Sequence, residues 1–224
     1  MQSSNRAASA RTQAIPARRL YRIDSWLSEA DANFLLKKKA IWSAKQGEYE
    51  TAIALFNRLI SLEPNTAEHY VNRGLVLAQN RQDDKAIADY NRALELDNTL
   101  DKAYNNRANL HAKRQDWADA ISDYDEAIDL NPLNTRARLN QAVTFREMGN
   151  AKEALTCLDI ALFFDAQSAA IYAERGRAYH VLGHWNCAIA DYRTALELTE
   201  TTLDKNANKK IARRVKRWMA SLSD

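Results

Sequence analysis

The residue types with the most potential for chemistry lie close together near the C-terminal end of the sequence. His180 and His184 are four residues apart, which is one helical turn, and Cys187 follows three residues later. Imidazole nitrogens and thiolates are common zinc ligands, and a structural zinc site needs four of them in a tetrahedral arrangement. Gly183 interrupts the helical pattern here, and no fourth ligand lies nearby in the sequence. We therefore expect no metal site.

The sequence also contains none of the common catalytic motifs. It has no glycine-rich phosphate loop and no G-x-S-x-G motif around a nucleophilic serine. The acidic stretch DYDEAID, which begins at Asp123, spreads its charges around a helix and is interpreted as a solvated face. The chain is therefore predicted to be non-catalytic and to need no cofactor.

The composition favours helices over strands. The 224 residues include only five Gly and three Pro, whereas average usage of the two together is about 12%, and an all-β chain needs many such turns. The longest apolar run, from Ile160 to Phe164, is far shorter than the ~18 residues of a membrane-spanning helix. The net charge of +3 is too small to imply nucleic acid or membrane. Cys157 and Cys187 form no disulfide framework, which favours a reducing compartment.

The clearest pattern is an internal repeat with a period of 34 residues. Four columns recur in five copies: Ala52, Ala86, Ala120, Ala154 and Ala188; Phe56, Tyr90, Tyr124, Leu158 and Tyr192; Leu59, Ala93, Ala127, Ala161 and Ala195; Leu62, Leu96, Leu130, Phe164 and Leu198. Successive columns are four, three and three residues apart, so they form one stripe of an α-helix. A second helix precedes it in each copy, with core columns that contain Leu36, Tyr70, Tyr104, Arg138 and Tyr172, and Ala40, Gly74, Ala108, Ala142 and Gly176.

The ends of these helices carry turn residues. Gly47, Gly149 and Gly183 recur at one position between the two helices, where glycine alone adopts a left-handed conformation at low cost. Pro64 and Pro132 lie between repeats, where proline ends one hairpin before the next begins.

This pattern resembles the tetratricopeptide repeat family, whose unit is a helix–turn–helix of 34 residues. The resemblance covers about residues 33–202, with repeats at about 33–66, 67–100, 101–134, 135–168 and 169–202. It implies an all-α fold, a right-handed superhelical solenoid of stacked hairpins that is stable as one cooperative unit. The fourth copy departs most, with Arg138 and Leu158 where aromatic residues are expected, and the first copy has Lys39 and Ala40 where a small residue next to a large one is expected.

The two ends of the chain are basic. Residues 203–224 are predicted to form an amphipathic capping helix, with an apolar stripe of Ala207, Ile211, Val215, Trp218 and Leu222. Its basic side is either solvated or docks on RNA or an anionic membrane through Lys209, Lys210, Arg213, Arg214, Lys216 and Arg217. Residues 1–24 form a basic arm that is predicted to be disordered, with an organellar transit peptide or a partner-binding arm as alternatives. Ser28 and Asp31 form a variant of the capping box before the first helix.

In the tetratricopeptide family the first helices of the repeats line a concave groove. The resemblance implies that repeat positions 2, 5, 6, 9, 12 and 13 face this groove. Eight basic side chains stand at these positions, against three acidic ones: Lys37, Lys38, Lys45, Lys102, Lys113, Arg136, Arg146 and Arg177 against Glu68, Glu147 and Glu174. The repeats as a whole carry 20 basic and 24 acidic residues. A basic groove inside an acidic shell favours an acidic, extended ligand.

A row of asparagines follows the same face. Position 6 reads Lys38, Asn72, Asn106, Asn140 and Glu174, and Asn105 and Asn109 flank its centre. An amide side chain donates and accepts at once, which suits the backbone of an extended peptide, and the row resembles the asparagine ladder of long tetratricopeptide solenoids. The alternative is a merely polar helix surface. The two-carboxylate clamp of chaperone-binding members is not reproduced in any register.

The sequence therefore predicts a cytoplasmic, non-catalytic adaptor or assembly factor that binds an acidic, extended protein segment in its groove. RNA or anionic-membrane docking through the C-terminal helix is the alternative function. Self-association through the ends of the solenoid is a further alternative. Organelle targeting is the alternative location if the N-terminal arm is a transit peptide.

Overall fold

The computed structural model describes residues 28–201 and 205–221. All regular secondary structure in these two ranges is helical. The helices, in chain order, are α1 Glu29–Lys45, α2 Tyr49–Leu62, α3 Ala67–Gln79, α4 Asp83–Leu96, α5 Asp101–Arg114, α6 Trp117–Leu130, α7 Thr135–Glu147, α8 Ala151–Phe164, α9 Ala169–Val181, α10 Trp185–Thr201 and α11 Lys205–Ala220. The predicted arm at residues 1–24 lies outside the described residues.

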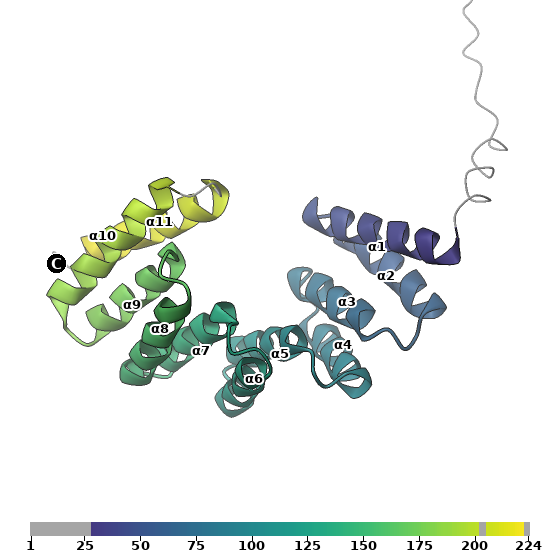
Figure 1. The fold of residues 1–224 in the computed structure, drawn as a ribbon, viewed down its shortest axis with the longest axis horizontal. Coiled ribbons are helices and arrows are strands. Elements are labelled where there is room, and N and C mark those ends of the chain that lie inside the picture. Colours follow the sequence, from purple (N-terminus) through teal and green to yellow (C-terminus); the bar gives the residue numbers. More distant parts are fainter. Residues whose placement is uncertain (1–27, 202–204, 222–224) are drawn as a thin grey trace, which may run out of the picture.

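The helices pair into five antiparallel hairpins that stack into an arc (Figure 1). Each odd-numbered helix from α1 to α9 packs on the next even-numbered one, and each hairpin packs on its neighbours. The first helices of successive hairpins also contact one another, α3 with α5, α5 with α7 and α7 with α9, whereas no comparable contact joins the second helices of the described hairpins. The first helices therefore lie on the inner side of the arc, and the predicted all-α solenoid is confirmed.

One turn residue inside each hairpin has a left-handed backbone. Gly47, Gly149 and Gly183 have φ values of +82°, +89° and +76°, as predicted from their recurrence. Arg81 and Gln115 stand in the same column of the second and third repeats and have φ values of +60° and +65°. The turn therefore imposes this conformation in all five repeats, including the two where the residue type gives no sign of it.

The core is built from the repeated small and aromatic columns. The alanines from Ala52 to Ala188 in the first column are fully buried, and so are the large residues from Phe56 to Tyr192 in the second column. A Cβ on Gly74 would lie 2.8 Å from Tyr90 Cε1, and one on Gly176 would lie 2.7 Å from Tyr192 Cδ1. These two glycines therefore allow the tyrosine rings to pack directly on the backbone of the first helix.

The N-terminal end of the solenoid lacks a preceding hairpin. Ser28 caps α1 by accepting a hydrogen bond from the Asp31 backbone N–H at 3.1 Å, which confirms the predicted cap. Leu35 and Trp42 are 50% and 57% exposed. In the other four repeats the residues in these two columns are buried against the hairpin before them. The structure therefore leaves an apolar end face on the outer side of α1.

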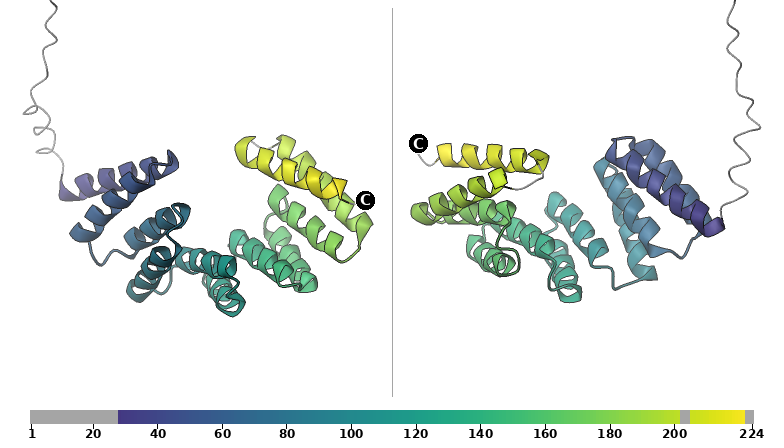
Figure 2. Two further views of the ribbon diagram at one scale, coloured as in Figure 1. Left: turned by 180° about the vertical axis from the view of Figure 1, so that it is seen from behind. Right: turned by 45° about the horizontal axis from the view of Figure 1, so that its top comes forward.

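The C-terminal end is covered by α11, which packs on α10 and α9 (Figure 2). Val215 is fully buried there, and the Trp218 ring lies 6.0 Å from that of Tyr192. The apolar side of α11 thus faces the fifth repeat. Among the described helices, none combines the length and the apolar character needed to cross a membrane.

Candidate peptide-binding groove

The amide side chains on the inner helices are linked to one another. Asn140 of α7 donates from Nδ2 to Asn105 Oδ1 at 3.1 Å, and Asn105 of α5 donates from Nδ2 to Asn106 Oδ1 at 3.2 Å. Asn105 is buried, whereas Asn106 and Asn140 are half-buried. The Asn106 amide N–H and the Asn140 amide oxygen are thus left for a ligand, one a donor and the other an acceptor.

The two outer members of the predicted row behave differently. Asn72 of α3 is half-buried and makes no hydrogen bond within the described residues, so both ends of its amide are open. Asn109 accepts a hydrogen bond from the Tyr124 hydroxyl at 2.8 Å, so it holds the core as well as lining the groove. Glu174, which replaces asparagine in the fifth repeat, is buried and bonded to Arg214 at 2.8 Å. The open part of the row is therefore Asn72, Asn106 and Asn140.

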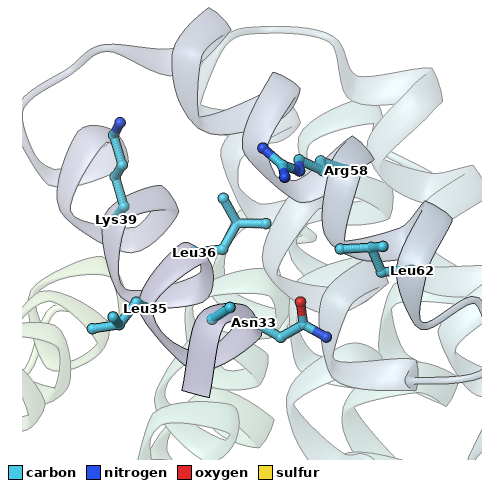
Figure 3. Close-up of a pocket in the computed structure, with 7 residues that line it drawn as sticks. Asn33, Leu35, Leu36, Lys39, Arg58 and Leu62 are labelled. Carbon is cyan, nitrogen blue, oxygen red and sulfur yellow. The ribbon is translucent and has the colours of Figure 1, made fainter. Parts of the chain in front are cut away.

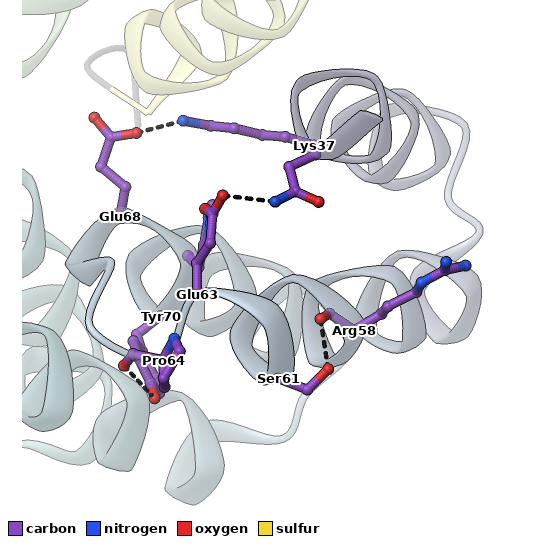
Figure 4. A network of polar contacts seen from close by, with 9 residues as sticks. Lys37, Arg58, Ser61, Glu63, Pro64, Glu68 and Tyr70 are labelled. Atoms are coloured by element: carbon purple, nitrogen blue, oxygen red, sulfur yellow. Dashed lines mark hydrogen bonds and ion pairs between the residues drawn. The ribbon is translucent and has the colours of Figure 1, made fainter. Parts of the chain in front are cut away.

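Most of the predicted groove cations are paired within the solenoid. Lys37 of α1 bridges to Glu68 of α3 (Figure 4) and holds the pKa of that carboxyl below its usual range by its hydrogen bond and its charge. Lys113 Nζ lies 2.5 Å from Asp83 Oδ2, and Arg146 Nη2 lies 3.4 Å from Glu174 Oε2. The groove is therefore less basic than its eight predicted cations suggest.

Two further cations rest on aromatic rings. The Arg177 guanidinium lies 5.6 Å from the centre of the Trp218 ring of α11 and bonds to His180 Nδ1 at 3.2 Å. Lys38 Nζ lies 5.3 Å from the centre of the Phe34 ring. Arg177 thus ties the C-terminal end of the groove to the terminal helix.

Lys102 and Arg136 remain open in the middle of the groove. Both are exposed, and neither has an ion-pair partner among the described residues. They line one pocket of about 480 Å³ together with Asn72, Leu75 and Asn106. Asp101 also lines it, and its carboxylate accepts hydrogen bonds from Asn131 Nδ2 and Asn134 Nδ2 at 2.9 and 3.0 Å.

A smaller apolar pocket adjoins this central pocket. It has a volume of about 230 Å³, lies between α1 and α3, and is lined by Ile41, Phe56, Val76, Asn72 and Leu75, with Lys45 at its edge. Asn72 and Leu75 line both pockets, so the two are continuous along the groove. Beyond the amide row a third pocket of about 240 Å³ lies between Asn109 and Glu147.

The end face of the solenoid carries a separate pocket, outside the groove. It has a volume of about 420 Å³ and lies on α1 and α2 (Figure 3). Leu35, Leu36, Leu62 and the basic side chains of Lys39 and Arg58 surround it. None of the predicted groove residues lines it.

Three arginines that the sequence analysis did not single out fix the angle between hairpins. Arg107 of α5 donates two hydrogen bonds to Asp123 of α6, at 2.7 and 2.8 Å, and a third to Asn91 of α4 at 2.7 Å. Arg73 and Arg175 make the same contacts with their own repeats and with the preceding ones. We call these three sets the arginine staples. Each ties both helices of one hairpin to the hairpin before it.

The staples correct the interpretation of the acidic stretch at Asp123. Asp123 is buried and bonded to arginine, whereas its neighbours Asp125 and Glu126 are exposed. The missed signal was that charged residues also recur with the 34-residue period. In the fourth repeat Gln141 and Cys157 replace the arginine and the aspartate, and Cys157 Sγ lies 3.4 Å from Gln141 Oε1. Burial raises the pKa of the Cys157 thiol.

The basic residues of α11 separate into two groups. Arg214 points to the solenoid, where it bonds to Glu174 and lies 4.9 Å from the centre of the Trp218 ring. The other five are exposed, and no ion pair involves them in the described part of the chain: Lys209, Lys210, Arg213, Lys216 and Arg217. Five of the six predicted docking residues therefore share the outer side of α11.

The candidate zinc ligands are not brought together as a metal site. His180 lies next to Arg177, the Tyr192 hydroxyl and the Trp185 ring, whereas the ring of His184 lies beside that of Tyr179. Across residues 28–201 and 205–221, no group of three or more His, Cys, Asp or Glu side chains is placed to hold a metal ion.

Comparisons with known proteins agree with this architecture. Two family models, both described as tetratricopeptide repeat, match residues 44–101 and 101–134. A solved structure described as "Crystal structure of MamA protein" has a TM-score of 0.63 at 20% identity and covers 76% of this chain and 93% of its own. A second, "MamA RS-1 ArsTM double mutant", has a TM-score of 0.64 at 15% identity and covers 76% and 96%.

At these identities the likeness to the solved structures shows the fold alone. No curated protein sequence matches the chain significantly. The family models cover parts of the first four repeats, and the five stacked hairpins extend the same unit along the chain. The chain is a tetratricopeptide repeat protein, a helical solenoid of the kind that serves as a protein-interaction scaffold.

Proposed function

We propose that this protein is a non-catalytic adaptor or assembly factor that binds an extended, acidic protein segment along its inner face. The observation that carries the proposal is the open row of amides at Asn72, Asn106 and Asn140. Such groups pair with the N–H and C=O groups of an extended backbone whatever its side chains are. Cys157 and Cys187 are free thiols, which is consistent with action in a reducing compartment such as the cytoplasm.

The direct test removes the amides together. The variant Asn72→Ala, Asn106→Ala, Asn140→Ala should retain the helical content, because none of these side chains belongs to the hydrophobic core. Peptides are first selected with the wild-type protein from a random twelve-residue display library. Their dissociation constants for the variant should rise about tenfold or more, since each hydrogen bond contributes about 0.5–1.5 kcal/mol.

A matched variant controls for the loss of three amides in general. Asn65, Asn98 and Asn186 are exposed, make no printed side-chain contact and line none of the groove pockets. Their joint replacement by alanine should leave the affinities unchanged. The groove proposal is wrong if the first triple variant binds the selected peptides as tightly as the wild type does.

A second function is favoured by the exposed cations on α11. Five basic side chains at residues 209, 210, 213, 216 and 217 share one side of a helix whose other side is held by the solenoid. This arrangement suits the docking of an anionic surface, either a membrane with acidic lipids or an RNA. Replacing all five by glutamine while keeping Arg214, which pairs with Glu174, should remove binding without loosening the helix.

Both anionic partners are tested at low salt. Sedimentation with phosphatidylserine vesicles and a gel shift with single-stranded RNA should show binding that falls steeply as salt is added. Two blank results for the wild-type protein would remove this second function and leave the first unaffected.

A further inference from the structure

The free positive charge of the groove is concentrated in one place. Lys37, Lys113 and Arg146 are neutralised by Glu68, Asp83 and Glu174. The C-terminal end is closed further, because Arg214 of α11 also bonds to Glu174. A ligand carboxylate that approached these cations would have to displace an existing partner. This competition disfavours recognition of acidic side chains at both ends of the groove.

The central pocket does not have this competition. Lys102 and Arg136 are exposed, come from two different helices and line the same pocket of about 480 Å³. The acidic residue nearest to them, Asp101, is occupied by the amide N–H groups of Asn131 and Asn134. Asn106, in the wall of this pocket, has an amide N–H that no protein group accepts. The pocket thus offers three donors to a carboxylate.

An apolar pocket of about 230 Å³ adjoins this charged one. Its walls are Ile41, Phe56 and Val76, and Leu75 separates it from the central pocket. This volume and lining suit one aliphatic side chain. Asn72 lies between the two pockets with its amide open, where it can hold the backbone of a segment that passes from one to the other.

We propose that the groove recognises a two-part determinant in its peptide ligand: an aliphatic side chain in the pocket between α1 and α3, and a carboxylate side chain between Lys102 and Arg136. The inference rests on the proposed peptide-binding function and assigns its specificity. Packed helices lie about 10 Å apart, so the pocket centres, about one and a half helix spacings apart, are separated by about 15 Å. An extended chain rises about 3.4 Å per residue, so the two side chains are about four residues apart.

Synthetic twelve-residue peptides test this determinant. The probe carries one Leu and one Glu four residues apart in a background of Ser, Thr and Gln. Three relatives replace Glu by Lys, replace Leu by Ser, or place the two residues adjacent to each other. Fluorescence polarisation should show that each of the three binds the wild-type protein at least tenfold more weakly than the probe does.

Charge reversal in the protein provides the complementary test. The variant Lys102→Glu, Arg136→Glu should bind the Leu–Glu probe at least thirtyfold more weakly and the Leu–Lys peptide more tightly than the wild type does. The control is Lys152→Glu, Arg193→Glu, which has the same net charge and changes two exposed side chains of α8 and α10. It should keep the wild-type preference. Circular dichroism checks that both variants remain helical.

The outcomes separate this inference from the proposed function. If the wild-type protein bound the Leu–Glu and Leu–Lys peptides equally well, or if charge reversal weakened both alike, the two-part determinant would be wrong. The amide triple variant gives a different signature, because it should weaken every peptide by a similar factor. Specificity lost with the amide effect retained contradicts this inference alone, whereas loss of the amide effect contradicts the proposed function.

Discussion

Arginine side chains set the relative placement of neighbouring hairpins. In each staple one guanidinium reaches an aspartate of its own repeat and an Asn or Asp of the repeat before it. The aspartates Asp89, Asp123 and Asp191 are all buried. A buried carboxylate that loses its partner is left with an uncompensated charge, so single substitutions at these sites should be costly.

The fourth repeat suggests a compensating substitution for such a loss. Replacing Arg107 by Ala should destabilise the fold by about 3 kcal/mol, because Asp123 then stays buried without its two hydrogen bonds. The pair Arg107→Gln, Asp123→Cys copies Gln141 and Cys157 and removes the charge at both sites. Thermal unfolding followed by circular dichroism should place this double variant between the wild type and Arg107→Ala. A double variant less stable than Arg107→Ala would contradict the argument.

His180 should make stability depend on pH near neutrality. Burial and the neighbouring Arg177 lower the pKa of His180 below its usual value of 6.5. The unfolded chain therefore takes up its proton first as the pH falls, so the contribution of neutral His180 is present above about pH 6.5 and is lost below it. The melting temperature of the wild type should fall more between pH 7.5 and 5.5 than that of His180→Gln. An NMR titration that gave His180 a pKa above 6.5 would contradict this.

At the scale of the helical hairpin, the left-handed turn residue is a shared requirement that different repeats meet differently. No atom lies within 4 Å of a Cβ built on Gly149, so its replacement by Ala meets only backbone strain. Gly149→Ala should thus cost about 1–2 kcal/mol. Gln115, in the same column with φ of +65°, already carries such strain. Gln115→Gly should be neutral or stabilise by up to about 1 kcal/mol, because relief of strain is partly offset by chain entropy.

Chemical denaturation measures both changes. The two substitutions exchange the same two types of backbone preference at equivalent sites, so each serves as a control for the other. If Gln115→Gly destabilised the protein as much as Gly149→Ala does, backbone conformation would not be the dominant cause in this column.

The hairpins were predictable from the sequence because their small and aromatic columns recur without interruption. Gly47 and Gly183 were also identifiable, since glycine is the residue that this turn favours, but Arg81 and Gln115 show no such sign. The groove could be predicted only in part. Repeat position indicates which side chains face inward, but the pairing of Lys113 with Asp83, 30 residues away, depends on how the hairpins stack. The opening left at Lys102 and Arg136 is therefore a property of the folded arc.

At the scale of the whole solenoid, equal positions in the repeat are unequal in burial. Leu35 and Ile171 stand in the same column, yet Leu35 is 50% exposed at the open end and Ile171 is 1% exposed inside the stack. Ile171→Ala should cost about 2–5 kcal/mol, since it leaves a cavity, whereas Leu35→Ala should cost less than about 1 kcal/mol. Urea titration of both variants checks this. Similar losses for the two would mean that the end face of α1 is covered in solution.

The arginine staples have a consequence for how such a molecule changes its length. Each staple joins residues 16 apart within a repeat and reaches back 16 residues to the repeat before it. Duplication or loss of one complete 34-residue unit between stapled repeats would place the same partners opposite one another again. An insertion of any other length inside a unit would separate them. Descendants of this gene can therefore acquire longer or shorter arcs by unequal recombination, with each new junction already bonded when it first appears.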